Sequence, residues 1–404
     1  MRRLWRHVAG AGMAAWMAAA AAPAMALSFT PVQPAVGPQL VLPKGFEYQI
    51  LISEGEQIRN GKFLRNNDLT VYLPLDGSDL GWLYVNHELR PGGGTRLTVA
   101  REGERWKVLE AVGVDFASVG GTWNNCAGSL TPWGTILSAE EYEPRTADEI
   151  PAGMVKDVNR YGWVVEVDPV TLRVTKHYAM GRFSHETALV MADRTTVYLT
   201  DDYRNGILAK FVADKPGDLS SGTLCVLDAA NRRWIEVPKD RAVLNDVRSW
   251  ALRHGATGFD RPEDIEYNPA DGKLYLAITG DDRKPAPDNY GKVVRIDPQT
   301  LQMETFIQGG PETGMFNPDN LQLDPQGNLW IFEDKYDDFI NARYGNNAVW
   351  VASTKDGSLR RFAQLPNGSE GTGPSFTPDG KTLFFSVQHP DPPWKASVVA
   401  IRGL

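Results

Sequence analysis

The chain has 404 residues, of which 42% are hydrophobic and 23% charged, and its formal net charge is −8. This negative charge argues against binding to nucleic acids or to anionic membranes. The chain is longer than a typical single hydrophobic core, yet no Ser/Gly linker or charge run marks a domain boundary. A repeat architecture, in which each unit packs on its neighbours, would resolve this conflict.

The first 26 residues predict a cleavable signal peptide. Arg2, Arg3 and Arg6 precede an apolar stretch, and residues 24–26 (Ala-Met-Ala) provide a small-x-small cleavage site. An uncleaved membrane anchor is the alternative, but the apolar stretch is short and interrupted by Gly and Pro. Cleavage removes three arginines and no acidic residue, which moves the net charge from −8 to −11. We therefore expect residues 27–404 to form a single periplasmic or secreted domain that is free of the membrane.

Six segments of the chain share one pattern. Each has a short apolar strand, a turn rich in Pro, Asp, Asn or Gly, a second β-rich strand, and then acidic or polar residues. This alternation predicts β-hairpins, and no helical periodicity runs through the chain. The six segments are Tyr72–Glu88, Gly128–Glu141, Ala188–Asp202, Ile265–Gly280, Leu321–Asp334 and Ser375–Val387.

The repeat predicts an all-β fold, a six-bladed β-propeller. Its turns recur at intervals of roughly 53 to 77 residues, which suits four-stranded blades with long loops. We expect Val398–Arg402 to pair with a strand near Phe46–Ile52 and so to close the ring. A two-sheet β-sandwich is the alternative, although six repeats in phase are hard to place in it.

Potential metal ligands occur at a constant position in these repeats. In four of them, the residue six positions before the turn is acidic or cysteine. The innermost strands of a propeller surround its axis, so equivalent side chains would form a ring at one depth. The residues are Cys126, Glu186, Glu263 and Asp319, and the last repeat has Thr372 at this position with Glu370 two residues earlier.

A second tier of polar residues follows or flanks the hairpins. For the pairs Glu140-Glu141 and Asp201-Asp202 we expect metal binding or support of the ligands, whereas Asp281-Asp282 is better interpreted as a solvated turn. Asp168, Asp297 and Asp324 are expected to cap turns, and His185 suits a ligand or a structural role equally. The tier also includes Glu333 and Asp334, and the first repeat offers Asn67, Asp68, Asn86, His87 and Glu88.

So many carboxylates around one axis would repel each other. A pair about 4 Å apart costs roughly 4 kcal/mol at an effective dielectric constant near 20. Bound cations would relieve this repulsion, and ligands that are mostly oxygen favour Ca²⁺. The sequence therefore predicts a central channel lined with metal-binding side chains that hold calcium.

Several stretches of the chain resemble the PhoX-type alkaline phosphatase family. The most specific stretch is NNCAGSLTPWGTILSAEE at Asn124–Glu141, and shorter matches follow one another through most of the mature chain. The shorter matches are Asn66–Asp68, Val85–Glu88, Tyr161–Pro169, Gly181–Ala188, Tyr198–Arg204, Phe259–Ile265, Asn317–Trp330 and Glu370–Pro390.

This resemblance implies an exported metal-dependent phosphatase whose substrate is a small phosphate monoester. It also implies a channel cluster that contains Ca²⁺ and two Fe³⁺ ions bridged by a cysteine and an oxo group. By this resemblance, Cys126 would bridge the irons, Glu140, Glu141, Glu186 and Glu370 would bind iron or calcium, and Glu263 and Asp319 would bind calcium.

The two cysteines have different expected roles. A thiolate held between two cations is deprotonated and resists oxidation, so the resemblance leaves Cys225 unpaired in an ordinary strand. A disulfide between Cys126 and Cys225 is the alternative, because an exported protein meets an oxidising environment.

Two arginines stand next to candidate ligands. Arg204 and Arg261 could contact phosphate oxygens through their planar guanidinium groups, or they could form salt bridges between blades. The resemblance to this family implies an arginine shortly before the glutamate that matches Glu370. Here residues 366–369 (Pro-Asn-Gly-Ser) occupy that loop, with Asn367 in place of the arginine, so one contact to the substrate is expected to be missing.

Two other functions are compatible with the repeat. One is a calcium-dependent lactonase or esterase, because six-bladed propellers with axial acidic residues support that chemistry. The other is a non-catalytic propeller that calcium stabilises and that binds a partner on its outer face. No exposed amphipathic helix suggests assembly, so we expect a monomer. The pair Arg2-Arg3 resembles part of a twin-arginine export signal, with Sec export as the alternative.

Overall fold

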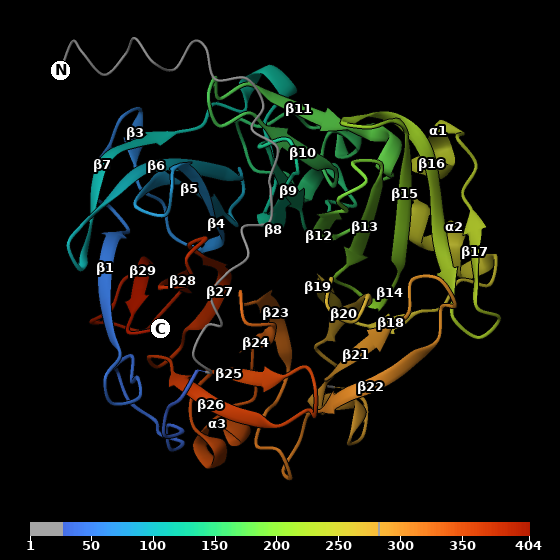
Figure 1. Ribbon diagram of the computed structural model, residues 1–404. Helices are drawn as coiled ribbons and strands as arrows, with labels where there is room; N and C mark the ends of the chain where they lie inside the picture. Colours follow the sequence, from blue (N-terminus) through green and yellow to red (C-terminus); the bar gives the residue numbers. More distant parts are fainter. Residues whose placement is uncertain (1–26, 282) are drawn as a thin grey trace.

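Six antiparallel sheets surround a central axis, as the blades of a propeller do (Figure 1). The computed structural model describes residues 27–281 and 283–404, so the predicted signal peptide lies outside the described residues. The prediction of an all-β, six-bladed propeller is confirmed, and the β-sandwich alternative is wrong.

Each blade begins at its innermost strand. Blade 1 comprises β4 (Asn67–Asp76), β5 (Leu80–His87), β6 (Gly93–Glu102) and β7 (Arg105–Gly113). Blade 2 comprises β8 (Asn125–Leu130), β9 (Ile136–Glu140), β10 (Val164–Val167) and β11 (Val174–His177). Blade 3 comprises β12 (His185–Val190), β13 (Thr196–Asp201), β15 (Leu208–Lys215), β16 (Asp218–Asp228) and β17 (Arg233–Glu236).

The other three blades continue around the axis. Blade 4 comprises β19 (Pro262–Asn268), β20 (Lys273–Ile278), β21 (Lys292–Ile296) and β22 (Met303–Gln308). Blade 5 comprises β23 (Pro318–Leu323), β24 (Asn328–Glu333), β25 (Ala348–Ser353) and β26 (Leu359–Gln364). Blade 6 comprises β27 (Glu370–Phe376), β28 (Thr382–Gln388), β29 (Ser397–Arg402) and β1 (Glu47–Ser53).

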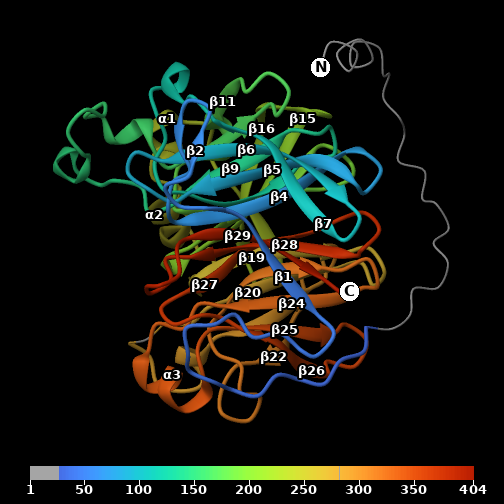
Figure 2. The ribbon, with the colours of Figure 1, turned by 90° about the vertical axis from the view of Figure 1, so that its left-hand side faces the viewer.

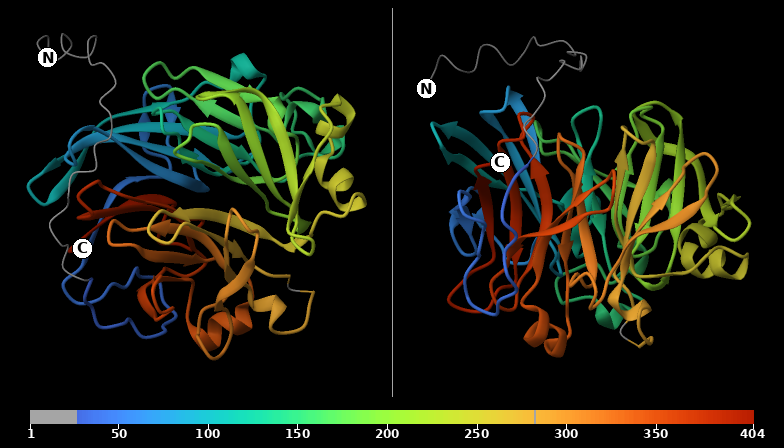
Figure 3. Two further views of the ribbon diagram at one scale, coloured as in Figure 1. Left: turned by 45° about the vertical axis from the view of Figure 1, so that its right-hand side comes forward. Right: turned by 60° about the horizontal axis from the view of Figure 1, so that its bottom comes forward.

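Strand β1 closes the ring by joining the two ends of the chain. It pairs antiparallel with β29, from Glu47 opposite Arg402 to Ser53 opposite Ser397. Figures 2 and 3 show the blue N-terminal strand beside the red C-terminal strands. The predicted closure is therefore confirmed to within one residue at each end.

Apolar side chains hold neighbouring blades together. Six hydrophobic clusters of buried residues each combine strands of two adjacent blades, so they follow one another around the ring. Between blades 6 and 1, for example, Phe384 packs between Tyr72 and Trp106, with ring centroids 5.4 and 4.9 Å away. Each sheet is thus apolar on both faces, and packing a ring of such sheets buries both.

Helices and small sheets lie in the connections outside the blades. The α-helices are α1 (Arg241–Leu244), α2 (Val247–Arg253) and α3 (Asp338–Tyr344). The two-stranded sheets pair β2 (Gln57–Ile58) with β3 (Gly61–Lys62), and β14 (Arg204–Gly206) with β18 (Phe259–Asp260). The 3₁₀ helices are Ala117–Val119, Ala147–Glu149, Val158–Arg160, Tyr178–Met180 and Asp288–Tyr290. Across the described chain, no helix combines the length and the apolar character needed to cross a bilayer.

Candidate metal centre and active site

A β-bulge near the start of the innermost strand places one side chain in the channel in five of the six blades. In all six blades, the pairing between the inner strand and its neighbour shifts register at this point. A bulge inserts one extra residue and re-aims the side chain that it carries. In five blades the first residue inside the shift is acidic or cysteine: Asp68, Cys126, Glu186, Glu263 and Asp319.

The backbone before these residues has a second repeated feature. Two positions earlier, the chain is left-handed in four blades, with φ between 37° and 59°. Asn adopts this conformation more readily than other non-Gly residues, and Asn66, Asn124 and Asn317 occupy it in three blades. Arg261 occupies it in blade 4 with φ 59°. The same left-handed turn therefore carries an arginine directly before β19 of blade 4.

The five bulge residues and four others form a continuous chain of potential ligand groups. Within each group, the ligand atoms lie within 4.8 Å of one another, and successive groups share a residue. The cavity between them has a volume of about 120 Å³, enough for several ions. The groups are Asp68–Glu88–Cys126, Cys126–Glu141–Glu186, Glu186–Glu263–Asp319 and Asp319–Asp334–Glu370.

The acidic pairs at the ends of the second strands divide into two roles. Successive side chains of an extended chain point in opposite directions. The second member of three pairs therefore lines the cavity: Glu141, Asp202 and Asp334. The first member is turned into the blade, where backbone N–H groups and a cation bind it: Glu140, Asp201 and Glu333.

The placement of Glu140 does not agree with its expected role as a metal ligand. Its two carboxylate oxygens accept hydrogen bonds from the backbone N–H groups of Trp123 and Trp163, both at 2.9 Å. The ammonium group of Lys176 is also 2.9 Å away, and both charged side chains are buried. Glu140 therefore fixes the loop before β8 and neutralises Lys176.

We expect Glu140→Gln and Glu141→Gln to affect different properties. Glu140→Gln would leave the buried Lys176 charge without its counterion, which costs about 3 kcal/mol of unfolding free energy. Burial raises the Glu141 pKa well above its usual value, so a neutral amide there costs little stability in metal-free protein. Urea unfolding of both variants tests this, and equal stabilities would contradict the assignment. Glu141→Gln should instead lose bound metal.

Arg261 links three acidic residues beside the cavity. Its guanidinium group donates two hydrogen bonds to Asp202, at 2.9 and 3.0 Å, and lies 2.7 Å from Glu263. Asp334 of the next blade is 3.9 Å away. Asp202 also accepts a 2.6 Å hydrogen bond from the Tyr142 hydroxyl. Asp202 thus lines the cavity next to the four ligand groups and serves chiefly to hold Arg261.

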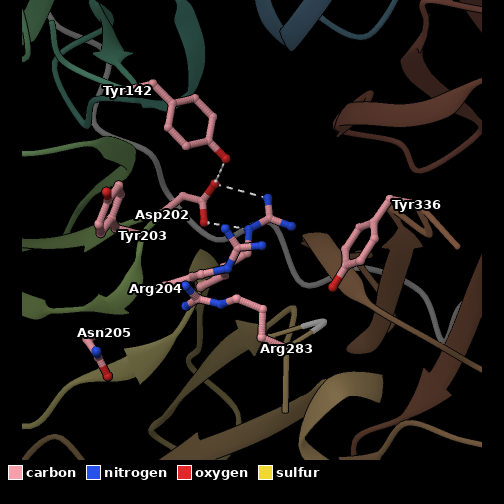
Figure 4. Close-up of a pocket in the computed structure, with 8 residues that line it drawn as sticks. Tyr142, Asp202, Tyr203, Arg204, Asn205, Arg283 and Tyr336 are labelled. Atoms are coloured by element: carbon pink, nitrogen blue, oxygen red, sulfur yellow. Dashed lines mark hydrogen bonds and ion pairs between the residues drawn. The ribbon is translucent and has the colours of Figure 1, made fainter.

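Arg204 lies further from the cavity, in a vestibule that opens onto it (Figure 4). Its Nε is 3.1 Å from Asp281 of the next blade. Arg204 and Arg261 therefore both form ion pairs between blades, and both also line the vestibule. The two expectations for these arginines, blade contacts and access to substrate, are compatible in this structure.

The loop before Glu370 lacks the arginine that the resemblance to the PhoX-type family would place there. The Asn367 side chain accepts a hydrogen bond from Asn346 at 2.9 Å and does not line the cavity. His389 instead reaches the cluster, with its Nε2 3.0 Å from Glu370 Oε1. No cation from residues 366–369 therefore contacts Glu370 in the described structure.

The electrostatics of the cavity favour cation binding. Burial raises the pKa of Asp68 to about 7 and that of Glu88 to about 8, and repulsion from neighbouring carboxylates adds to both shifts. Burial followed by repulsion raises the pKa of four further acids in the same way. Asp68 Oδ1 is buried and has no hydrogen-bond partner. The four acids are Glu186, Glu263, Asp319 and Glu370.

The donor set fits the predicted metals. Carboxylate groups without sulfur suit Ca²⁺, whereas the two groups that share Cys126 add a thiolate, a ligand that iron accepts. Burial and then nearby carboxylates, Asp68 foremost, raise the pKa of the Cys126 thiol well above its usual value. A cation between these groups is therefore needed to keep the thiolate deprotonated.

Both cysteines are free, so the disulfide alternative is wrong. Cys225 lies on β16 of blade 3, whereas Cys126 is buried in the channel.

His185 is structural, because it is fully buried and its Nε2 contacts the Gly181 carbonyl at 2.9 Å. The three expected turn caps are present: Asp168, Asp297 and Asp324 each accept two backbone hydrogen bonds.

Three residues of the cluster were not singled out as ligands by the sequence. Asp68 stands six positions before Pro74, the same offset that identified its equivalents, so the signal for it was present. Glu88 and Asp334 are each the residue after a strand-end side chain that points into the blade. Only the direction of their side chains distinguishes Glu88 and Asp334 from the residues that precede them.

Comparisons with known proteins identify the family of this chain. The model of the family "Alkaline phosphatase PhoX" matches residues 27–119 and 93–391. The structure of Pseudomonas fluorescens PhoX in complex with vanadate, a transition state analogue, is 25% identical, with a TM-score of 0.79, and the match covers 93% of this chain and 98% of that chain. A putative gluconolactonase is 14% identical with a TM-score of 0.44, over 93% of this chain and 97% of that chain. No curated protein sequence matches significantly. The chain therefore belongs to the alkaline phosphatase PhoX family and is a phosphatase.

Proposed function

We propose that this protein is an exported, monomeric, metal-dependent phosphatase that hydrolyses small phosphate monoesters at a Ca²⁺ and Fe³⁺ cluster in the propeller channel. The observation that carries this proposal is the chain of four ligand groups, one thiol and eight acids, that shares a buried cavity. The residues before Leu27, with their basic start and small-x-small site, support export to the periplasm or outside the cell.

The donor chemistry divides the proposed metals along the channel. The groups that contain Cys126 would hold iron, and the acid-only groups around Asp319 would hold calcium. When bound, such cations polarise the phosphoryl group, neutralise the charge on its oxygens and activate water at neutral pH.

Arg261 would bind the phosphoryl oxygens from the protein side. Burial by itself lowers its pKa, but Asp202 and Glu263 outweigh burial and raise the Arg261 pKa well above its usual value. The guanidinium group therefore stays charged, and the two hydrogen bonds that it donates to Asp202 fix its plane. A fixed planar cation beside the cavity would orient a phosphate before reaction and stabilise its charge during reaction.

Vanadate gives a direct test. We expect the metal-loaded protein to release nitrophenol from p-nitrophenyl phosphate, and orthovanadate to inhibit competitively, because vanadate adopts the geometry of phosphoryl transfer at such sites. Initial rates at several vanadate concentrations measure this. The structure of Pseudomonas fluorescens PhoX is a complex with vanadate, a transition state analogue.

Nitrophenol release, measured beside hydrolysis of a lactone, separates the alternative functions. A calcium-dependent lactonase would hydrolyse a lactone but release no nitrophenol, and a binding module would hydrolyse neither. Hydrolysis of a lactone alone, by protein with full metal content, would overturn the proposed phosphatase function. Metal analysis of protein exported by its own signal distinguishes calcium and iron from ions acquired during overexpression.

A further inference from the structure

Three blades share one buried arrangement at the end of their second strand. The strand-end acid that points into the blade accepts a backbone N–H through each of its two carboxylate oxygens. One N–H belongs to the loop before the innermost strand, and the other lies at the start of the third strand. Each acid therefore ties three strands together at the end of the blade where the metal ligands lie. The acids are Glu140 in blade 2, Asp201 in blade 3 and Glu333 in blade 5.

In blade 2, this arrangement lies between two side chains of the cluster. The Trp123 N–H, three residues before Cys126, donates to Glu140 at 2.9 Å. Glu140 itself directly precedes Glu141 in the chain. The ammonium group of Lys176 completes the arrangement, 2.9 Å from Glu140, and both side chains are buried. The ion pair thus fixes the backbone beside both Cys126 and Glu141, which belong to one ligand group.

Blade 5 repeats the arrangement around two other ligands. The Phe316 N–H, three residues before Asp319, donates to Glu333 at 2.9 Å. Glu333 directly precedes Asp334. Lys335 contacts Glu333 at 2.8 Å, and again both side chains are buried. Asp319 and Asp334 share a ligand group that consists of carboxylates alone.

Blade 3 uses an arginine in place of the lysine. The Ser184 N–H, two residues before Glu186, donates to Asp201 at 3.1 Å. Arg248 holds both oxygens of Asp201, at 2.7 Å through Nε and 2.5 Å through Nη2. Glu186 belongs to two ligand groups, one with Cys126 and one of carboxylates alone.

These ion pairs do more for direction than for stability. A buried ion pair adds little net stability, because the loss of hydration offsets the Coulomb attraction. An acid that binds two N–H groups and a cation, however, cannot turn without breaking three contacts. Groups that orient metal ligands in this way typically change metal affinity 10- to 100-fold when they are removed. None of the three cations lines the cluster cavity, so any effect they have on the ions must pass through the acids.

We propose that Lys176, Arg248 and Lys335 are positioning residues of the metal centre, each of which fixes the cluster side chains of its own blade through a buried acid. This inference rests on the proposed function, because it concerns the ions that the proposed function assigns to the channel. The effect is local to each blade. Lys176 acts on the iron held by the groups with Cys126, Lys335 acts on the calcium around Asp319, and Arg248 acts on both ions through Glu186.

Release of the ions into a chelator tests the proposal. Metal-loaded protein is mixed with excess EDTA, and the iron and calcium that remain bound are measured over time by mass spectrometry of desalted samples. We expect Lys176→Met to release iron about tenfold faster with little change for calcium, and Lys335→Met to release calcium about tenfold faster with little change for iron. Arg248→Met should speed the release of both ions.

A buried arginine outside these arrangements is the control. Arg96 is buried and pairs with Glu110 at 3.1 Å, between the two outer strands of blade 1. Arg96→Met should lower the thermal stability but leave the release of both ions unchanged. This variant separates a loss of stability from a loss of ligand orientation.

A double variant keeps the test usable if Lys176→Met does not fold. Glu140→Gln combined with Lys176→Met leaves no unpaired charge in the blade. It should still release iron faster, because the amide can accept only one of the two N–H groups that Glu140 accepts.

Two outcomes would overturn the positioning role while leaving the phosphatase function standing. One is release of both ions by the lysine variants at the rates of the unmodified protein. The other is an equal acceleration of both ions in Lys176→Met and in Lys335→Met, which would indicate general loosening of the ring. An unmodified protein that binds neither iron nor calcium would overturn the proposed function as well.

Discussion

Replacing Cys126 with alanine is expected to lower phosphatase activity about 1000-fold. Cys126 belongs to two of the four ligand groups and is the only sulfur among the described ligands. A catalytic cation supplies several kcal/mol of transition-state stabilisation, and each 1.36 kcal/mol corresponds to tenfold in rate. Losing the thiolate should therefore remove the iron and most of the rate. Nitrophenol release and metal content, measured on the same sample, check both effects.

Cys225 is a matched control for this substitution. It is also a free cysteine, but it lies on β16, away from the channel. Cys225→Ala should keep activity and metal content near those of the unmodified protein. If Cys126→Ala retained full activity with normal iron content, the thiol would have no place in the metal centre. If both variants lost activity equally, the effect would arise from cysteine removal in general.

Stripping the cations with a chelator is expected to make stability fall as the pH rises from about 4 to 8. Burial raises the pKa of Asp68 to about 7 and of Glu88 to about 8, whereas both titrate near pH 4 when unfolded. The folded protein then binds more protons than the unfolded chain over this interval, so the unfolding free energy decreases with pH. Each unit of pKa shift corresponds to about 1.4 kcal/mol, so the total loss amounts to several kcal/mol.

Bound cations should reverse this dependence. They replace the protons as neutralising charge, and a ligand present at 100 times its Kd adds about 2.7 kcal/mol of stability. Thermal unfolding of chelated and Ca²⁺-loaded protein at pH 5 and pH 8 measures the effect. We expect a small difference at pH 5 and a large one at pH 8. Chelated protein that is equally stable at both pH values would contradict the crowding of ionised acids in the channel.

The sequence by itself determined the architecture. Hairpin turns and β-rich strands are local features, and their recurrence predicted six blades, the closing strand and the common position of Cys126, Glu186, Glu263 and Asp319. Local periodicity carries this information because each blade is a meander of neighbouring strands, so most pairings join segments close in sequence.

Only the tertiary structure decided which acid of each pair faces the channel. Glu140 and Glu141 look alike in sequence, but the β8 bulge and the buried Lys176, which comes from β11, hold Glu140 inside the blade. The vestibule was beyond sequence reasoning for the same reason, since Tyr142, Arg204, Arg283 and Tyr336 come from four blades. A side chain's direction depends on partners that are distant in the chain. A local sequence pattern does not show which of these partners contacts it.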